Sequence, residues 1–167
     1  MDQKNEQQKP EKDEGKELLK EYLNQYYICR MKRTQLEKRL KSIQEEINTP
    51  IGGYEYSPVN YRGTNKVGAG AASFVYRMSE IETRIADQKN RAEKYLLRIL
   101  DILDFLDENS PERMVLELRF IDCNNWWDIE KAMHLSRRAC FNYQNKALDK
   151  LLKFKKIQAI LNEYKTC

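Results

Sequence analysis

Two long stretches of this chain carry an apolar residue at every third or fourth position, which is the spacing of one face of an α-helix. They cover residues 16–48 and 71–107. Spacings of three and four alternate as in a heptad repeat. The first stripe is Leu19, Tyr22, Tyr26, Cys29, Leu36, Leu40, Ile43 and Ile47, and the second is Phe74, Met78, Ile81, Ile85, Ala92, Tyr95, Ile99, Ile102 and Leu106. We therefore expect an all-α fold built around two long helices.

Each stripe has one polar break, at Arg33 and at Gln88. If the second helix folds back antiparallel with Ile47 opposite Phe74, both breaks fall in the same layer. In a wrong register each polar side chain would face an apolar partner and lose its hydrogen bonds. This predicts a long antiparallel helical hairpin with an Arg33–Gln88 layer and Asp87 as charge partner of Arg33. The alternative is that each polar side chain only reaches the edge of the seam.

The segments beside these stripes break the pattern. Residues 49–70 contain two prolines and five of the six glycines, which predicts a loop. Residues 1–15 have no large apolar residue beyond the first Met, which predicts a disordered tail. The predicted organisation is a tail over 1–15, a helical hairpin over 16–108 with its loop at 49–70, and a separate module over 109–167. The apolar face at the end of the second helix must be covered by that module or by another chain.

The C-terminal module begins with its own helix signals. Asn109 or Ser110 can cap a helix, and Pro111 suits the first helical position. The apolar positions of this first helix are expected to be Met114, Leu116, Leu118 and Phe120. Trp126 and Trp127 follow its loop, and core packing is the first expectation for both, with exposure as the alternative for Trp127.

A turn is predicted at residues 133–136, between two further helices. Asn125 can cap the helix over 126–133, with Asp128 three residues later in capping-box position. That helix is too short to be stable alone, so it must dock on others. Ser136 can cap the helix after the turn. Short helices around a turn, followed by a longer basic helix, are typical of a helix-turn-helix DNA reader.

The helix after Ser136 has two distinct faces. Its apolar positions form one continuous stripe consisting of Cys140, Tyr143, Ala147, Leu151, Phe154, Ile157 and Leu161. Arginine can bind guanine with two hydrogen bonds and asparagine can bind adenine in the same way, so the opposite face can read bases. The predicted DNA-binding residues are Ser136, Arg137, Arg138, Phe141, Asn142, Asn145 and Lys146.

Charge is concentrated in the same region. Between Lys131 and Lys156 there are eight Lys or Arg against a single acid, Asp149, which gives a net charge of +7 in a chain whose total is +4. Neutralising DNA phosphates requires such a local concentration of cations. The alternative is a lysine-rich face that only contacts solvent, but the arginines and asparagines in the first turns favour DNA.

The sequence resembles a known module here. The segments Leu116–Phe120, Trp126–Ile129, Met133–Ser136 and Lys146–Leu148 are similar to the helix-turn-helix of region 4 of bacterial sigma factors. Small phage-borne proteins carry that module behind a helical N-terminal half; they include late-transcription regulators of the RinA and ArpU types and a related family of unknown function. The resemblance implies that the helix after Ser136 reads promoter DNA. It places Arg137, Arg138, Phe141 and Asn142 where region 4 reads the major groove.

Three positions depart from that pattern. Glu130 stands where a small Ala is usual, and we expect it to point past the helix contact or to pair with Lys131 or Arg137. His134 stands where Gly usually makes the turn, and His can adopt the left-handed conformation at some cost. Phe141 stands where a polar reader is usual, and it can either touch a thymine methyl group or pack on protein.

Nothing in the chain indicates catalysis. Its four cysteines, Cys29, Cys123, Cys140 and Cys167, are far apart, and His134 is the only histidine, so we expect no metal site. There is no phosphate-binding loop and no nucleophile–base pattern, so we expect no enzyme activity, catalytic residue or cofactor. The N-terminus is polar and no stretch is long and apolar enough for a membrane span, which indicates a cytoplasmic protein without a membrane partner.

Three functions fit these features. The first is a sequence-specific DNA-binding transcription regulator, phage or prophage encoded, whose partner is double-stranded DNA; RNA polymerase and a second copy bound through the N-terminal helices are further candidate partners. The second is a small terminase-like packaging subunit that recognises DNA. The third is a helical protein-interaction adaptor that binds no DNA. A chain cut at about Glu108 should leave a folded C-terminal module, with weaker DNA affinity if the N-terminal hairpin dimerises.

Overall fold

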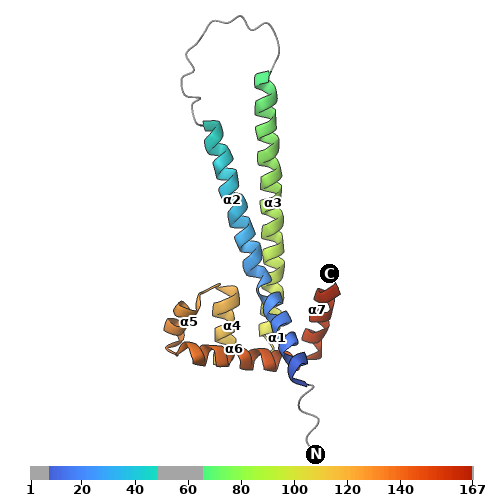
Figure 1. Cartoon of the computed structure of the whole chain (residues 1–167), viewed down its shortest axis with the longest axis vertical. Coiled ribbons are helices and arrows are strands. Elements are labelled where there is room, and N and C mark those ends of the chain that lie inside the picture. Colours follow the sequence, from blue (N-terminus) through green and yellow to red (C-terminus); the bar gives the residue numbers. More distant parts are fainter. Residues whose placement is uncertain (1–7, 49–65, 167) are drawn as a thin grey trace, which may run out of the picture. The chain divides into compact units, whose positions relative to one another are not determined.

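The computed structural model describes residues 8–48 and 66–166, and all regular secondary structure in that part is helical, without a strand (Figure 1). The all-α expectation is confirmed. The elements are α1 (Gln8–Leu23), α2 (Gln25–Asn48), α3 (Lys66–Leu103), α4 (Pro111–Leu116), the π-helix η1 (Glu117–Ile121), α5 (Trp126–Met133), α6 (Arg137–Leu151) and α7 (Lys155–Thr166).

The chain forms two compact units. The core unit comprises residues 1–28 and 91–167, and the two-helix unit comprises residues 29–90. This division does not follow the predicted boundary after residue 108, because the N-terminal helix and the end of α3 belong with the C-terminal third.

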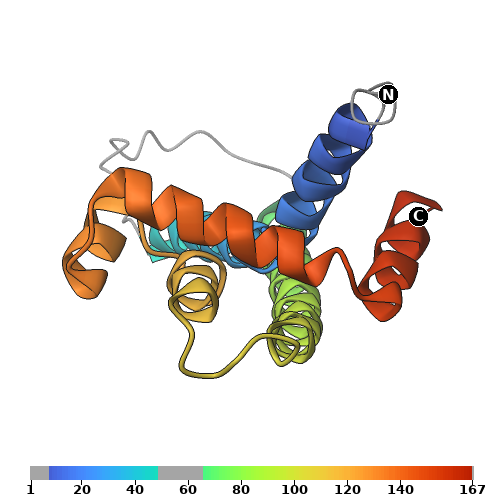
Figure 2. The same ribbon diagram turned by 90° about the horizontal axis from the view of Figure 1, so that it is seen from below.

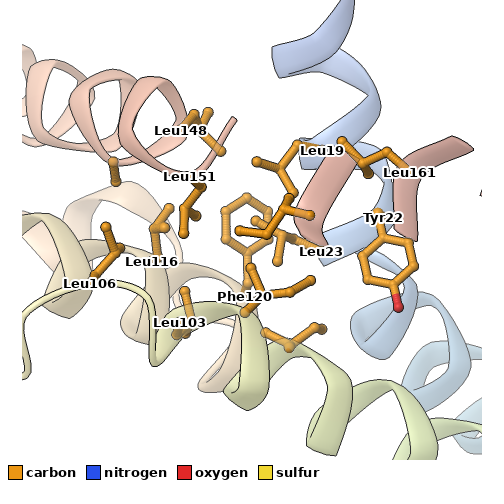
Figure 3. Packing of buried hydrophobic residues seen from close by; sticks show 14 residues of the cluster. Leu19, Tyr22, Leu23, Leu103, Leu106, Leu116, Phe120, Leu148, Leu151 and Leu161 are labelled. Carbon is orange, nitrogen blue, oxygen red and sulfur yellow. The ribbon is translucent and has the colours of Figure 1, made fainter. Parts of the chain in front are cut away.

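The core unit is built around one apolar cluster (Figure 3). Its members come from α1, the end of α3 and the segment after it, α4, η1, α6 and α7. They are Leu19, Tyr22, Leu23, Ile99, Ile102, Leu103, Leu106, Leu116, Phe120, Ala147, Leu148, Leu151, Ile157 and Leu161. The apolar face at the end of α3 is thus partly covered by this chain's own C-terminal helices, while Leu97 on α3 stays 63% exposed.

Helix α1 begins before the predicted start. Residues 8–15 are helical, so the expected disordered tail is wrong over these residues, and residues 1–7 lie outside the described part. Gly15 lies beside Leu152, where an added Cβ would stand 3.5 Å from that side chain. Leu19 and Leu23 are fully buried in the core cluster. Once these residues anchor the helix, extending it toward the N-terminus costs little, because propagation is easier than nucleation.

The single helix predicted over residues 16–48 is divided at Asn24. The backbone N–H of Asn24 still donates to the carbonyl of Lys20 at 2.9 Å, and that of Ile28 donates to Asn24 at 3.1 Å. The heptad pattern runs through this point, so apolar periodicity gave no signal for it.

Helix α3 also begins early. Residues 66–70 are helical, which corrects the end of the predicted loop. Gly68 and Gly70 each cost about 1 kcal/mol relative to Ala in a helix interior, a penalty that a 38-residue helix can absorb. The rest of that predicted loop, residues 49–65, lies outside the described residues.

In the two-helix unit, residues of α2 and α3 run side by side in opposite directions (Figure 1). The predicted stripes are the less exposed positions in both helices: Arg33, Leu36, Leu40 and Ile43 in α2, and Phe74, Met78, Ile81, Ile85 and Gln88 in α3. Leu36 lines one small pocket together with Arg84 and Gln88. The side chain of Ile47 lies outside the described part, so its pairing with Phe74 stays a prediction.

The predicted charge partner of Arg33 is wrong. Its Nε lies 3.3 Å from Oε1 of Glu37, one turn further along α2, and Asp87 is exposed to solvent. A partner four residues away on the same helix needs no particular register of the second helix. The pair therefore gives no support to an Arg33–Gln88 layer.

The segment from α4 to η1 follows a helical period rather than the predicted alternation. Ser110 is the cap, since its Oγ accepts from the N–H of Arg113 at 3.2 Å. Leu116 and Phe120, four residues apart, are buried, whereas Met114 is exposed. Residues two apart face different sides of a helix, so the four predicted apolar positions cannot all point inward.

The continuous helix predicted after Ser136 is also wrong. Helix α6 ends at Leu151, and α7 begins at Lys155. The side-chain amide of Gln158 donates to the carbonyl of Leu152 at 2.7 Å across this bend. The bend allows both α6 and α7 to contact α1 (Figure 2), and Phe154 at the bend is partly exposed.

Candidate nucleic-acid interface

The turn between α5 and α6 has the predicted geometry. His134 adopts the left-handed conformation, with φ 53° and ψ 39°. Its N–H donates to the carbonyls of Glu130 and Lys131, and the N–H of Leu135 donates to Glu130 at 3.1 Å. These bonds satisfy the last carbonyl groups of α5, which is how a left-handed residue ends a helix. The expectation for His134 is confirmed.

Both helices begin at the predicted caps. Oδ1 of Asn125 accepts from the N–H of Asp128 at 3.0 Å, and the Asn125 amide donates to the Asp128 carboxylate at 2.6 Å. Oγ of Ser136 accepts from the N–H of Ala139 at 3.3 Å. Its oxygen is therefore engaged in the first turn of α6, so Ser136 contributes mainly to positioning that helix.

All the other predicted DNA-binding residues are exposed positions of helix α6. These are Arg137, Arg138, Phe141, Asn142, Asn145 and Lys146. Its inner side buries Cys140, Gln144, Ala147, Leu148 and Leu151. Burial of the inner side fixes the rotation of the helix about its axis, so the six outer residues share one surface.

The outer residues of α6 differ in whether they already have a hydrogen-bond or ion-pair partner within the protein. Nε of Arg137 lies 2.5 Å from Oε1 of Glu130, which confirms one of the two pairings expected for Glu130. Arg138, Asn142 and Asn145 have no hydrogen-bond or ion-pair partner within residues 8–48 and 66–166. Their polar groups are thus available to an external ligand, whereas Arg137 first has to leave or share Glu130.

Phe141 packs partly on protein. Its ring centroid lies 4.1 Å from that of Trp126, with 34° between the ring planes. It remains 39% exposed, so the same side chain can still be touched from outside. Close to it on the same helix, Nζ of Lys146 lies 5.5 Å from the ring of Tyr143.

Trp127 contradicts the expectation of core packing, because it is 56% exposed. Nζ of Lys131 lies 3.3 Å from its ring centroid. The spacing in the sequence indicates this difference. Ile129 is buried, and a residue two positions away on a helix does not share its face. Trp126, three positions from Ile129, lies on the same face of the helix as Ile129.

Ion pairs neutralise only part of the positive charge. Lys150 donates to Glu112 at 2.9 Å, and this hydrogen bond holds the pKa of the Glu112 carboxyl below its ordinary value. Asp149, the one acid of the cationic segment, pairs with Lys16 of α1 at 3.0 Å. Among the described residues, six cations of the segment have no carboxylate partner: Lys131, Arg138, Lys146, Lys153, Lys155 and Lys156.

Two other features of the described chain bear on function. The thiol of Cys140 is buried, and burial raises its pKa, which is the behaviour of an inert core cysteine. No group of three or more potential metal ligands occurs among the described residues, and none of the helices described there is long and apolar enough to cross a membrane.

No protein-family model matches this chain, and no curated protein or solved structure is similar to it at a significant level. The candidate interface therefore rests on its own geometry and charge.

Proposed function

We propose that this protein is a sequence-specific DNA-binding transcription regulator in which α5, the turn at His134 and α6 form a helix-turn-helix. The observation that carries the proposal is the outer side of α6. Arg138, Asn142 and Asn145 lie there without a partner among the described residues, beside Lys146 and on a helix whose rotation is fixed by its buried side.

The chemistry of these side chains suits the major groove. Arg138 can donate two hydrogen bonds to guanine, and Asn142 or Asn145 can bind an adenine edge. Lys146 is placed for a phosphate. The exposed part of Phe141 can contact a thymine methyl group while its other part stays on Trp126.

Arg137 has a different proposed role. Its pairing with Glu130 connects the start of α6 to α5, so it holds the two helices in position. Glu130 is only 24% exposed at its side chain, which keeps this carboxylate from facing the DNA phosphates directly.

The two-helix unit is proposed to be an antiparallel helical hairpin that pairs with a second copy, and RNA polymerase is a further proposed partner. The observation behind self-association is that Val75 and Tyr76 of α3 are 67% and 69% exposed. Two copies would present two α6 helices to successive half-sites, the common arrangement of helix-turn-helix proteins.

The test is duplex-DNA binding measured by fluorescence anisotropy over a salt series, with a random-sequence duplex and with a site selected from a random pool. The variant Arg138→Ala/Lys146→Ala removes two cations from α6. The matched control, Lys38→Ala/Lys89→Ala, removes two exposed lysines from the two-helix unit. We expect the α6 variant to lower the salt slope by about 0.9 for each DNA phosphate that the removed cations neutralise, and the control to leave the slope unchanged.

Base reading is tested separately with Asn142→Ala. This variant should lose about 1–3 kcal/mol on the selected site and little on random duplex. Equal losses on both duplexes would remove Asn142 from the reading set. Absence of duplex binding at low salt would overturn the proposal and leave the adaptor function.

A further inference from the structure

An open pocket of about 430 Å³ lies in the core unit, next to the proposed reading helix. It is lined by residues of α1, η1, α5 and α6 and by Asn24. Its volume is in the range of pockets that hold small organic ligands. Two of its lining residues, Phe141 and Gln144, belong to α6, so a ligand here would touch the helix proposed to read DNA.

Gln144 is the unusual residue of this pocket. It is only 5% exposed and is the one buried polar residue of the described chain, yet its amide has no hydrogen-bond partner among the described residues. The amide is not one of the enclosed, unpaired side-chain groups of the described residues, so its atoms reach the open space of the pocket. Its donor and acceptor groups are therefore accessible to a ligand that supplies both.

The pocket also offers flat aromatic and guanidinium surfaces. Trp126 and Phe141 pack against each other, and the guanidinium of Arg119 lies 5.3 Å from the Trp126 ring. Arg119 is held by a hydrogen bond to the carbonyl of Asn124 at 2.9 Å. The part of Phe141 that remains exposed can accept one more planar group. Such surfaces favour a flat ligand.

The charges around the pocket cancel. Glu17 and Glu21 are balanced by Lys20 and Arg119, and Lys20 already donates to Glu17 at 2.7 Å. A strongly anionic or cationic ligand would gain no net attraction from this set. The pocket therefore fits a neutral ligand.

We propose that this pocket binds a nucleobase. A nucleobase is neutral and flat, and it carries a donor beside an acceptor on one edge. The Gln144 amide would bind that edge, as Gln binds adenine in DNA complexes, and the ring would stack on Phe141. The base can come from a free nucleoside or from a DNA strand bound on α6 and turned out of its stack. Only the second source rests on the proposed function.

The test uses Trp126 as reporter in the variant Trp127→Phe, which removes the only other tryptophan and leaves the pocket lining intact. We expect adenosine, guanosine, cytidine or thymidine to quench Trp126 emission, and ribose 5-phosphate, which has no base, to leave it unchanged. In this background Gln144→Leu and Gln144→Met should each weaken binding at least tenfold. Gln88→Leu in the two-helix unit is the matched control and should bind as the parent does. Thermal melts show which variants are folded.

A second arm addresses DNA as the source. A duplex with one mismatched pair, whose base leaves the stack more easily, should bind more tightly than the paired duplex, and Gln144→Leu should remove that preference. Nucleoside quenching without duplex binding would support the pocket and refute the proposed function. Duplex binding with neither nucleoside quenching nor a mismatch preference would overturn the pocket proposal and leave the proposed function standing.

Discussion

The two units of this protein use the same sequence pattern and reach different burial. In the core unit, Leu19, Ile99 and Leu148 are fully buried. Among the described residues of the two-helix unit, only Cys29 is buried, and its stripe residues, such as Leu36, stay partly exposed. Two helices can shield only the seam between them, whereas the core unit surrounds each apolar side chain with several helices. A heptad stripe predicts which face turns inward, and the number of neighbouring helices decides how far it is buried.

The two units also differ in what their apolar residues do: those of the core unit stabilise the fold, whereas some of those in the two-helix unit are free to contact another molecule. The core unit holds its apolar residues in one cluster, while the two-helix unit leaves Val75 and Tyr76 in solvent. Since apolar burial is the main stabilising contribution to folding, substitutions in the core unit should cost far more. Four predictions test this, in decreasing order of expected effect.

The largest effect is expected for an isolated fragment of residues 109–167. Seven of the fourteen core-cluster residues come from before residue 109, so the fragment should be unfolded by circular dichroism, against the expectation from sequence. The control is a variant that keeps the core unit and replaces residues 31–88 with a long flexible Gly/Ser linker. This variant should still be folded and unfold cooperatively. A cooperatively folded 109–167 fragment would show that the core unit is not the folding unit.

Next is Leu151→Ala, which removes a fully buried side chain of α6. We expect a loss of about 2–5 kcal/mol in the free energy of unfolding, from the reduced apolar burial and the cavity left behind. Leu36→Ala in the two-helix unit should cost about 1 kcal/mol or less, because its side chain is only half-buried. Urea titrations followed by tryptophan emission for the core unit and circular dichroism for the whole chain measure both. Equal costs would contradict the contrast in burial.

A smaller effect is expected for Ser136→Ala, which removes the cap of α6. Its loss should cost about 0.5–2 kcal/mol, because the N–H of Ala139 loses its acceptor. Ser42→Ala in α2 is the control: its hydroxyl only donates to the carbonyl of Lys38 within the helix, and stability should change by about 0.5 kcal/mol at most. Thermal denaturation compares the two, and a larger loss for the Ser42 variant would reverse the ranking.

The smallest effect concerns Glu112. The hydrogen bond from Lys150 lowers the pKa of its carboxyl below the ordinary 4.5. A lowered folded-state pKa means that the pair stabilises the fold above that ordinary value and that this contribution is lost as the pH falls through the folded-state pKa. Lys150 is half exposed, so solvent limits the contribution to about 0.5 kcal/mol at neutral pH.

Unfolding titrations from neutral to acidic pH compare wild type with Glu112→Gln. The difference between them should disappear on acidification. Glu80→Gln, which removes the exposed pair with Arg84 in α3, is the control for the loss of a surface carboxylate. A difference between wild type and Glu112→Gln that persists at acidic pH would exclude the ion pair as its cause.

The sequence by itself determined the local features. Asn125 and Ser136 cap their helices as predicted, α5 runs over the predicted residues, and His134 takes the left-handed conformation. These features depend on bonds within a few residues, so the local residue types suffice to specify them. The exposed side of α6 is predictable for the same reason, since helical period alone separates it from the buried side.

Only the tertiary structure decided what lies at long range. It placed α1 in the same core as the C-terminal helices, divided α6 from α7, and brought Gln144 into one pocket with Trp126 and Phe141. None of these follows from a local rule, because each depends on which distant helix supplies the covering surface. A stripe of apolar residues shows that a face must be buried, and its partner is known only when all the helices are packed together.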